Sequence, residues 1–281
     1  MQRKLKIKKG PEIHLYRQDC LKGMAGKVKP GSVDIVVTSP PYNIGVAYGH
    51  YDDNRPLDDY LAWLTEWGKE VRKTLKDEGS LFLNIGSKPT EPEIPFRVLD
   101  SLLGSFKIQN VIHWVKSIYI EAESYHNNIE INVGHYKPIN SPRFLNDTHE
   151  YIFHLTKTGQ VPLDRLALGV PYKDDSNVTR WNNGKSKIRC RGNCWFIPYE
   201  TIQNRKSDRP HPASFPPQLA ENCIRLHGYN PETLVMDPFT GIGSTAMACH
   251  RLGVGFIGFE IDPYYIKAAR TRLAQSVKSG Q

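Results

Sequence analysis

Short, almost uninterrupted apolar runs that alternate with amphipathic stretches are the feature that most constrains the fold of this chain. The runs lie at residues 33–37, 80–86, 110–115, 150–155, 233–237 and 254–260. Strands that are buried on both faces read as continuous apolar segments, so we expect these runs to form a mostly parallel sheet. After the first run, apolar residues from Leu57 to Leu75 recur every three or four positions, with Pro56 near their start, which predicts an amphipathic helix. Asp262 and Pro263 predict the start of another helix over 264–277. The sequence therefore predicts an α/β fold.

The middle of the chain departs from this pattern. Residues 120–149 and 157–212 are rich in Asn, Gly, Pro, Lys and Arg and show little periodicity. Loops this long inside a compact domain are usually functional or belong to a separate lobe. We therefore expect a discontinuous α/β domain, with one half in 1–119 and the other in 211–281. A recognition insertion, 120–210, would separate them and contain one core strand near 150–155.

Positive charge is concentrated in this middle region. The formal net charge of the chain is +8, and residues 157–209 contain eleven Lys or Arg against five Asp or Glu. The same stretch includes the aromatic residues Tyr172, Trp181, Trp195, Phe196 and Tyr199. Cations bind phosphates and rings stack on bases, so this mixture is typical of nucleic-acid binding. The alternative is a solvated basic loop region.

Cysteine usage and hydropathy argue against several other classes of protein. The five cysteines are odd in number and scattered, which argues against a disulfide framework. Cys190 and Cys194 form a CxxxC pair, but no second pair stands at zinc-ligand spacing and His211 is too distant, so we expect no metal. No run approaches the about 18 apolar residues of a membrane span, and the basic N-terminus lacks the apolar stretch of a secretory signal. We expect a cytoplasmic protein without membrane contact. The sequence leaves the choice between a monomer and a homodimer open.

The segment TSPPYN, residues 38–43, directly follows the first apolar run. Two consecutive prolines fix the backbone and remove two N–H donors, while their carbonyl oxygens can still accept. A serine hydroxyl precedes the prolines and a tyrosine ring follows them. Such a rigid corner is suited to bind a flat group that carries an amino group.

A second unusual segment, DPFTGIGS, begins at Asp237, where another apolar run ends. Gly241 and Gly243 let the backbone bend and approach a ligand, and a helix that begins at Ser244 offers free N–H groups. Glu260 ends the next run, nineteen residues after Gly241, where a carboxylate can accept from a ribose diol. The same glycines with Ala246 also satisfy the dinucleotide fingerprint. A nicotinamide enzyme and a glycine turn kept for packing are therefore rival interpretations.

Together the two segments resemble the motifs of the amino-methyltransferases, which transfer a methyl group from S-adenosylmethionine to an exocyclic nitrogen of a base in DNA. Their catalytic motif, (D/N/S)-P-P-Y, is matched by residues 39–42, and their cofactor motif, D-x-F-x-G-x-G, by residues 237–243. The order of catalytic motif, insertion and cofactor motif is that of the beta class. The resemblance covers nearly the whole chain. It implies a Rossmann-like methyltransferase fold with helices on both faces of the sheet, the catalytic half in 1–119 and the cofactor-binding half in 211–281.

The resemblance also implies which residues form the site. Asp19, in RQDC, would accept from the adenine amino group of the cofactor, unless it caps a turn, and Glu260 would hold the ribose. HPASFPPQLAENCI, residues 211–224, resembles the segment whose helix flanks the methionine end. The residues expected to bind S-adenosyl-L-methionine are Asp19, Cys20, Thr38, His211, Ser214, Asp237, Phe239, Gly241, Gly243, Ser244, Thr245, Glu260 and Ile261. The catalytic residues would be Ser39, Pro40, Pro41 and Tyr42, and the nucleic-acid contacts Asn43, Arg180, Trp181, Lys187, Arg189 and Arg191.

On this interpretation the rigid corner activates an amino nitrogen whose lone pair is conjugated with its ring. The Ser39 hydroxyl and the Pro40 carbonyl would accept from its two hydrogens, and Tyr42 would stack on the base, which must be flipped out of the duplex. The methyl group would then move in line from a sulfonium, with the rate gain coming from positioning and charge placement.

The target base follows from the first residue of the catalytic motif. Within the family S-P-P-Y leans toward cytosine N4 and D-P-P-Y toward adenine N6, so we expect methylation of cytosine N4 in DNA. Adenine N6 in DNA and cytosine N4 in ribosomal RNA are the alternatives. A nucleic-acid-binding protein that keeps the fold without catalysis is a hypothesis of another class.

Overall fold

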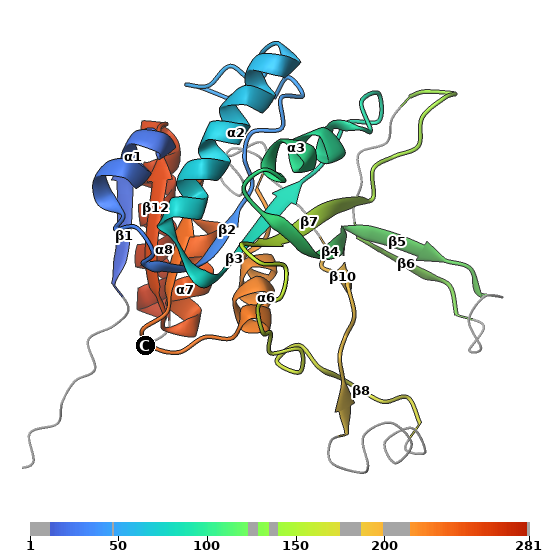
Figure 1. The fold of residues 1–281 in the computed structure, drawn as a ribbon. Coiled ribbons are helices and arrows are strands. Elements are labelled where there is room, and N and C mark those ends of the chain that lie inside the picture. The colour runs from blue at the N-terminus through green and yellow to red at the C-terminus, as the bar shows by residue number, and fades with distance from the viewer. Residues whose placement is uncertain are drawn as a thin grey trace, which may run out of the picture.

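One mixed sheet forms the centre of the molecule. The computed structural model describes residues 12–46, 48–122, 129–134, 140–174, 187–198 and 214–279. Eight strands form the sheet in the order β1-β12-β11-β2-β3-β7-β4-β10 (Figure 1). They are β1 (Ile13–Arg17), β2 (Val33–Thr38), β3 (Leu75–Ile85), β4 (Lys107–Val115), β7 (His149–Thr156), β10 (Cys194–Phe196), β11 (Leu234–Asp237) and β12 (Gly255–Glu260). All neighbouring pairs are parallel except the two made by β7, which runs antiparallel to both β3 and β4. The predicted mostly parallel sheet is confirmed.

Helices cover both faces of this sheet, as expected. They are α1 (Cys20–Lys27), α2 (Leu57–Thr74), α3 (Ile94–Leu102), α6 (Pro217–His227), α7 (Ser244–Leu252) and α8 (Pro263–Ser279) (Figure 1). Side chains alternate along β2, so that Val36 packs in a core with α1, α2 and α3. Its neighbours Ile35 and Val37 pack on the other face in a core with α6 and α7. Because both faces are buried, the strands have the continuous apolar sequence from which they were predicted.

Elements with weaker sequence signals were missed. The two predicted helices are confirmed, and they begin at Leu57 and Pro263. Strand β3 begins at Leu75, earlier than the apolar run, because residues 76–78 within it are polar and exposed. The edge strand β1 is only partly buried and does not read as an apolar run. The helices α1 and α3 are eight and nine residues long, too short to show a clear period.

Part of the basic middle region belongs to the core. Strand β10 pairs with β4 at the edge of the sheet, and Trp195 within it is 1% exposed. The Trp195 indole N–H donates to the Gly192 carbonyl at 3.1 Å. The expectation that Trp195 offers its ring to a nucleic-acid base is therefore wrong. An aromatic residue in a basic segment was counted as a stacking platform although it packs inside the protein.

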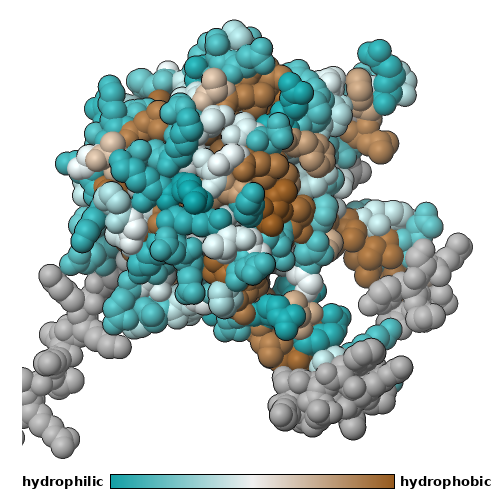
Figure 2. Space-filling model, viewed as in Figure 1, coloured by the Kyte–Doolittle hydropathy of each residue, from teal (hydrophilic) through white to brown (hydrophobic). Residues whose placement is uncertain are grey.

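Two hairpins project from this side of the molecule. They are β5 (Ser117–Ile120) with β6 (Ile131–Gly134), and β8 (Val170–Pro171) with β9 (Ile188–Arg189) (Figure 1). On the first hairpin Tyr119 and Val133 are exposed, and Figure 2 shows hydrophobic side chains at the surface there. Lys187, Arg189 and Arg191 are exposed on and beside β9. In the part of the chain that the structure describes, every helix is too short or too polar to cross a membrane.

Candidate active site at the carboxyl ends of β2 and β11

The two motif segments meet because β2 and β11 are parallel neighbours. Their register pairs Ile35 with Val235 and Val36 with Met236, so both strands end at the same edge of the sheet. Thr38 closes β2 and Asp237 closes β11, and the Thr38 hydroxyl donates to Asp237 Oδ1 at 2.6 Å. A carboxylate at one strand end thus binds a hydroxyl at the other, and joins the two corners directly.

Asp237 also holds the start of α7. Its Oδ2 accepts from the Thr245 hydroxyl at 2.7 Å, and its Oδ1 accepts from the Phe239 N–H at 3.0 Å. Asp237 is 1% exposed, and burial raises its pKa to about 6 against the lowering effect of the Thr38, Thr245 and Phe239 hydrogen bonds. We call Thr38, Asp237 and Thr245 the Asp237 cluster. All of its donors are neutral.

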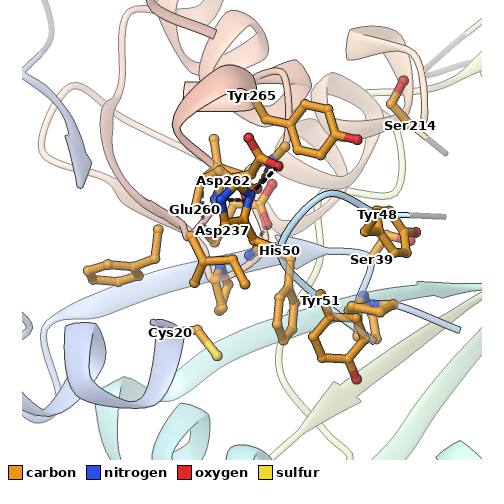
Figure 3. A pocket seen from close by; sticks show the side chains of 18 of the residues that line it. Cys20, Ser39, Tyr48, His50, Tyr51, Ser214, Asp237, Glu260, Asp262 and Tyr265 are labelled. Carbon is orange, nitrogen blue, oxygen red and sulfur yellow. Dashed lines mark hydrogen bonds and ion pairs between the residues drawn. The ribbon is translucent and has the colours of Figure 1, made fainter. Parts of the chain in front are cut away.

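A cavity of about 290 Å³ opens between the two corners. Figure 3 shows Ser39, Asp237 and Glu260 around it, with Cys20 on one side and Ser214 on another. Thirteen of the predicted site residues line the cavity: Asp19, Cys20, Ser39, Pro40, Pro41, Tyr42, Ser214, Asp237, Phe239, Gly241, Ser244, Glu260 and Ile261. The cavity therefore brings the predicted catalytic corner and the predicted cofactor turn together.

Other predicted residues lie behind the cavity wall or away from it. Thr38 and Thr245 are buried and bind Asp237 rather than line the space. Gly243 lies at the N-cap of α7 with a φ of 83°, and a Cβ there would be 3.0 Å from the Ala269 Cβ, so the turn requires glycine. Asn43 has a φ of 58°. Its side-chain amide donates to the Arg55 carbonyl and accepts from the Arg55 N–H, both at 2.8 Å, which commits it to the local loop.

The predicted nucleic-acid contacts are not brought to the cavity. Lys187, Arg189 and Arg191 do not line it, and Arg191 Nε donates to the Leu168 carbonyl at 3.2 Å. Arg180 and Trp181 lie outside the described residues, as does His211 of the predicted cofactor set.

Two carboxylates lie where the cofactor motif would need them. Glu260 Oε2 accepts from the Gly241 N–H at 2.9 Å, and Oε1 accepts from the Asp262 N–H at 2.9 Å. Burial raises the pKa of Glu260, and each oxygen keeps a second lone pair for a ligand hydroxyl. Asp19 Oδ1 accepts from the Lys22 N–H at 3.0 Å and so caps α1, while the residue also lines the cavity. The capping role weighed against the ligand role is thus present.

The sequence analysis missed a loop that covers the cavity. The Asp53 carboxylate accepts from the backbone N–H groups of Asn43, Ile44 and Val46 at 2.8, 3.2 and 2.9 Å, and so folds the chain after TSPPYN into a compact loop. His50 Nδ1 lies 2.9 Å from Asp262 Oδ2 and ties this loop to the start of α8 (Figure 3). The loop residues that line the cavity are Tyr48, His50, Tyr51 and Arg55. Their density of rings directly after TSPPYN was the available signal.

The catalytic corner is bonded to a second buried carboxylate. Tyr42 Oη lies 2.9 Å from Ser39 Oγ, 2.8 Å from Asn84 Nδ2 and 2.9 Å from Glu150 Oε2. Lys116 Nζ lies 3.1 Å from Glu150 Oε1. On the other side, Tyr60 donates to the Pro41 carbonyl at 2.6 Å. Among the described residues no donor bonds the Pro40 carbonyl. We call Ser39, Tyr42, Asn84, Lys116 and Glu150 the Glu150 cluster.

The residues around the cavity fit S-adenosylmethionine. The volume is close to the lower end, about 300 Å³, of small-molecule sites. Glu260 offers acceptors for a diol, and Phe239 and Ile261 offer apolar surface. Helix α7 begins at the cavity wall with Ser244, and no described side chain caps its first N–H groups, which favours a carboxylate there.

Comparison with known protein sequences gives a family match. A family model described as DNA methylase, N6_N4_Mtase, matches residues 33–271. The type II methyltransferase M.BglII of Bacillus subtilis is 31% identical over 92% of this chain and 69% of its own length. M.HpaI of Haemophilus parainfluenzae is 28% identical over 88% of this chain and 69% of its length. The DNA adenine methyltransferase YhdJ of Escherichia coli is 28% identical over 88% and 78%.

Solved structures share the fold. The PvuII DNA methyltransferase, cytosine-N4-specific, superposes with a TM-score of 0.67, covers 94% of this chain and 89% of its own, and is 21% identical. A DNA modification methylase from Thermus thermophilus, solved in complex with S-adenosyl-L-methionine, has a TM-score of 0.59 at 24% identity, with 94% of this chain and 93% of that one covered.

Proposed function

This chain belongs to the DNA methylase family of N6 and N4 methyltransferases, and from that premise we propose that it methylates the exocyclic amino group of a flipped cytosine in DNA. S-adenosyl-L-methionine is the methyl donor. Family membership argues against the nicotinamide interpretation of the glycine turn. It also favours an enzyme over a protein that only binds nucleic acid.

One observation supports the proposal most strongly. The Asp237 cluster joins the end of β2 to the end of β11, so Ser39 and Gly241 line the same cavity. A methyl transfer needs the acceptor nitrogen and the sulfonium within reach of one another, since the reaction is an in-line displacement whose rate depends on positioning. Had the two corners opened into separate cavities, the proposal would fail.

The cofactor half of the cavity would hold S-adenosylmethionine through named contacts. Glu260 accepts from the ribose diol with the lone pairs that Gly241 and Asp262 leave unused. Asp19 accepts from the adenine amino group with the oxygen that does not cap α1. Phe239 and Ile261 line the space beside the adenine, and the first N–H groups of α7 bind the carboxylate of the methionine end.

The catalytic corner would bind the amino group of the base. The Ser39 hydroxyl and the Pro40 carbonyl accept from its two hydrogens, which draws the nitrogen toward a pyramidal geometry and frees its lone pair. The prolines hold both acceptors in place, and Tyr60 fixes the corner from behind through the Pro41 carbonyl at 2.6 Å. The methylated nitrogen then loses its extra proton readily. Extrusion of the base requires a few kcal/mol, which contacts in the cavity offset.

The choice of cytosine rests on Ser39, because S-P-P-Y is the form of the motif that leans toward cytosine N4. Adenine N6 is the second candidate, and it is favoured by the similarity to the Escherichia coli DNA adenine methyltransferase over 88% of this chain. Ribosomal RNA is the alternative polymer, because a flipping cavity recognises the base rather than the backbone.

Nucleoside mass spectrometry tests the proposal and separates these candidates. The purified protein is incubated with deuterated-methyl S-adenosylmethionine and either unmethylated genomic DNA or ribosomal RNA, and the polymers are digested to nucleosides. We expect labelled N4-methylcytosine from the DNA alone. Labelled N6-methyladenine would replace cytosine by adenine, and label in RNA alone would replace the polymer. The proposal is wrong if neither polymer carries label at an exocyclic nitrogen while the protein binds the cofactor.

A further inference from the structure

The Glu150 cluster is not explained by the catalytic motif. Glu150 comes from β7 and Lys116 follows β4, so neither belongs to TSPPYN, and neither lines the cavity. Yet Glu150 Oε2 lies 2.9 Å from Tyr42 Oη, which in turn lies 2.9 Å from Ser39 Oγ. A continuous hydrogen-bonded chain therefore connects a carboxylate behind the cavity to the hydroxyl inside it.

The carboxylate in this chain is ionised. Its side chain is 10% exposed, and it accepts from Lys116 Nζ at 3.1 Å and from Asn84 Nδ2 at 2.7 Å. Burial favours the protonated form, but the Lys116 charge and the bonds from Asn84, Lys116 and Tyr42 together lower the pKa of Glu150. A cation and hydrogen-bond donors on both oxygens hold Glu150 as an acceptor only.

An acceptor at one end fixes the direction of every hydrogen bond in the chain. Tyr42 has a single O–H, and it must donate that proton to the ionised Glu150. The Tyr42 oxygen is then an acceptor for the Asn84 amide and for the Ser39 hydroxyl. Ser39 therefore spends its only proton on Tyr42, and its lone pairs remain for a ligand in the cavity.

Packing holds the chain in this geometry. A Cβ at Gly86 would lie 3.0 Å from both the Tyr42 ring and the Glu150 side chain, so the strand end allows these two residues to meet only because position 86 is glycine. Tyr42 and Glu150 are also held on either side by Asn84, whose amide nitrogen lies 2.8 Å from Oη and 2.7 Å from Oε2.

We propose that Glu150 is a positioning and specificity residue which, through Tyr42, turns the Ser39 hydroxyl into an acceptor and so selects bases that carry an amino group. This deepens the proposed function and rests on it. A base amino group donates to Ser39 and is accepted. The oxo counterpart of the same base, uracil for cytosine or hypoxanthine for adenine, presents an oxygen to the Ser39 lone pairs and is rejected, because two acceptors face each other without a proton.

Glu150→Gln reverses the logic with almost no change in shape. A glutamine amide can donate to Tyr42 Oη, which lets Tyr42 donate to Ser39 and points the Ser39 proton into the cavity. We expect the single-turnover rate of methyl transfer to fall on the order of 100-fold, as for the loss of one preorganised group at a reacting centre, with S-adenosylmethionine binding retained. Glu221→Gln is the matched control, because Glu221 is 18% exposed and paired with Arg251 at 2.8 Å but lies on α6. It should transfer at the wild-type rate.

A double-mutant cycle separates this role from a structural one. Tyr42→Phe keeps the ring and removes the link, so it should slow transfer as Glu150→Gln does. In the Tyr42→Phe background the Glu150→Gln change should add nothing, because Glu150 acts only through the Tyr42 hydroxyl. Losses that multiply in the double variant would show that Glu150 acts by another route and would overturn the proposal.

Binding of oxo-base DNA gives a second readout that does not depend on turnover. Once the methylated position is mapped, duplexes with the natural target base or its oxo counterpart are titrated in the presence of S-adenosylhomocysteine. We expect the wild-type protein to prefer the amino base and Glu150→Gln to lose most of that preference. An active wild type with an unchanged rate and preference in Glu150→Gln refutes this inference alone. A wild type that labels no nucleic acid refutes the proposed function, and the inference with it.

Discussion

Two buried carboxylates flank the Ser39 corner, and they differ in the groups that face them. Asp237 accepts from two threonine hydroxyls and one backbone N–H, all neutral, and its pKa is raised to about 6. Glu150 accepts from the Lys116 ammonium as well as from neutral donors, and its pKa is lowered. Burial favours the protonated form in both, so the sign of the net effect is decided by the cation.

The difference assigns different roles to the two carboxylates. Asp237 joins three segments of chain, and a neutral acceptor of the same shape could replace part of that role. Glu150 must remain an anion, because the direction of the bonds through Tyr42 to Ser39 depends on it. The predictions below test this comparison by removing the cation, by titrating the acid that lacks one, by removing a neutral donor and by removing a charge at the surface.

Removal of the Lys116 charge should have the largest effect. Lys116→Met leaves Glu150 buried without its cation, which should lower the free energy of unfolding at pH 8 by about 3 kcal/mol or more. The Glu150 pKa would rise above its unfolded value, so the loss should shrink as the pH falls and Glu150 takes up a proton. Urea unfolding at several pH values measures this.

The double variant Lys116→Met/Glu150→Gln is the control. It should recover part of the stability at pH 8 and lose the pH dependence that Glu150 causes. Asp147 and His149 also interact with Lys116, and their titration persists in both variants and cancels between them. If Lys116→Met is as stable as the wild type at pH 8, the cation does not determine the state of Glu150.

Titration of Asp237 should give the opposite slope to that of an acid paired with a cation. Its pKa is raised from 3.8 to about 6, so the folded state binds the proton more tightly and gains stability as the pH falls from about 7 to about 4. At about 1.4 kcal/mol per pH unit the gain is up to about 3 kcal/mol. It is measured as the wild-type free energy of unfolding minus that of Asp237→Asn at each pH. A difference that stays flat would show that Asp237 is ionised at no cost.

Removal of one neutral donor should have a smaller effect. Thr38→Val keeps the shape and leaves Asp237 Oδ1 without its 2.6 Å bond, which should cost about 1–2 kcal/mol at pH 8. Because that bond lowers the Asp237 pKa, the titration described above should move to higher pH. Thr65→Val makes the same chemical change at a hydroxyl that bonds only backbone carbonyls of residues 61 and 101, and it should leave the Asp237 titration where it is.

A charge pair at the surface should have the smallest effect. Lys69 and Glu66 on α2 lie 2.7 Å apart, closer than Lys116 and Glu150, but their side chains are 61% and 64% exposed. Glu66→Gln should change the free energy of unfolding by less than about 0.5 kcal/mol. A loss as large as that of Lys116→Met would mean that proximity of opposite charges, and not burial, explains the behaviour of Glu150.

The sequence predicted those parts of the site that are local in the chain. TSPPYN and DPFTGIGS each contain the turn, the strand end and the side chains that line the cavity, so their short patterns were sufficient. Asp237 was predicted as a cofactor contact. Its oxygens instead bind Thr38 and Thr245, because β2 and β11 are neighbours and a short carboxylate at one strand end reaches the other.

Contacts between distant segments could not be predicted in this way. Tyr42 and Glu150 are 108 positions apart, and they meet because β7 enters the sheet antiparallel beside β3. The apolar run of β7 predicts a strand but not its direction or neighbours. The same holds for Trp195, whose basic surroundings in sequence gave no sign that β10 joins the edge of the sheet.

Labelled methyl transfer by Ser39→Ala, measured beside its affinity for S-adenosylmethionine, tests the central claim most directly. The cofactor contacts lie on β12, α7 and the turn after β11, so the account predicts a Kd close to that of the wild type. It predicts that transfer to DNA falls on the order of 100-fold or more, because the acceptor that prepares the amino nitrogen is gone. Transfer at the wild-type rate, with the cofactor bound, would contradict the account.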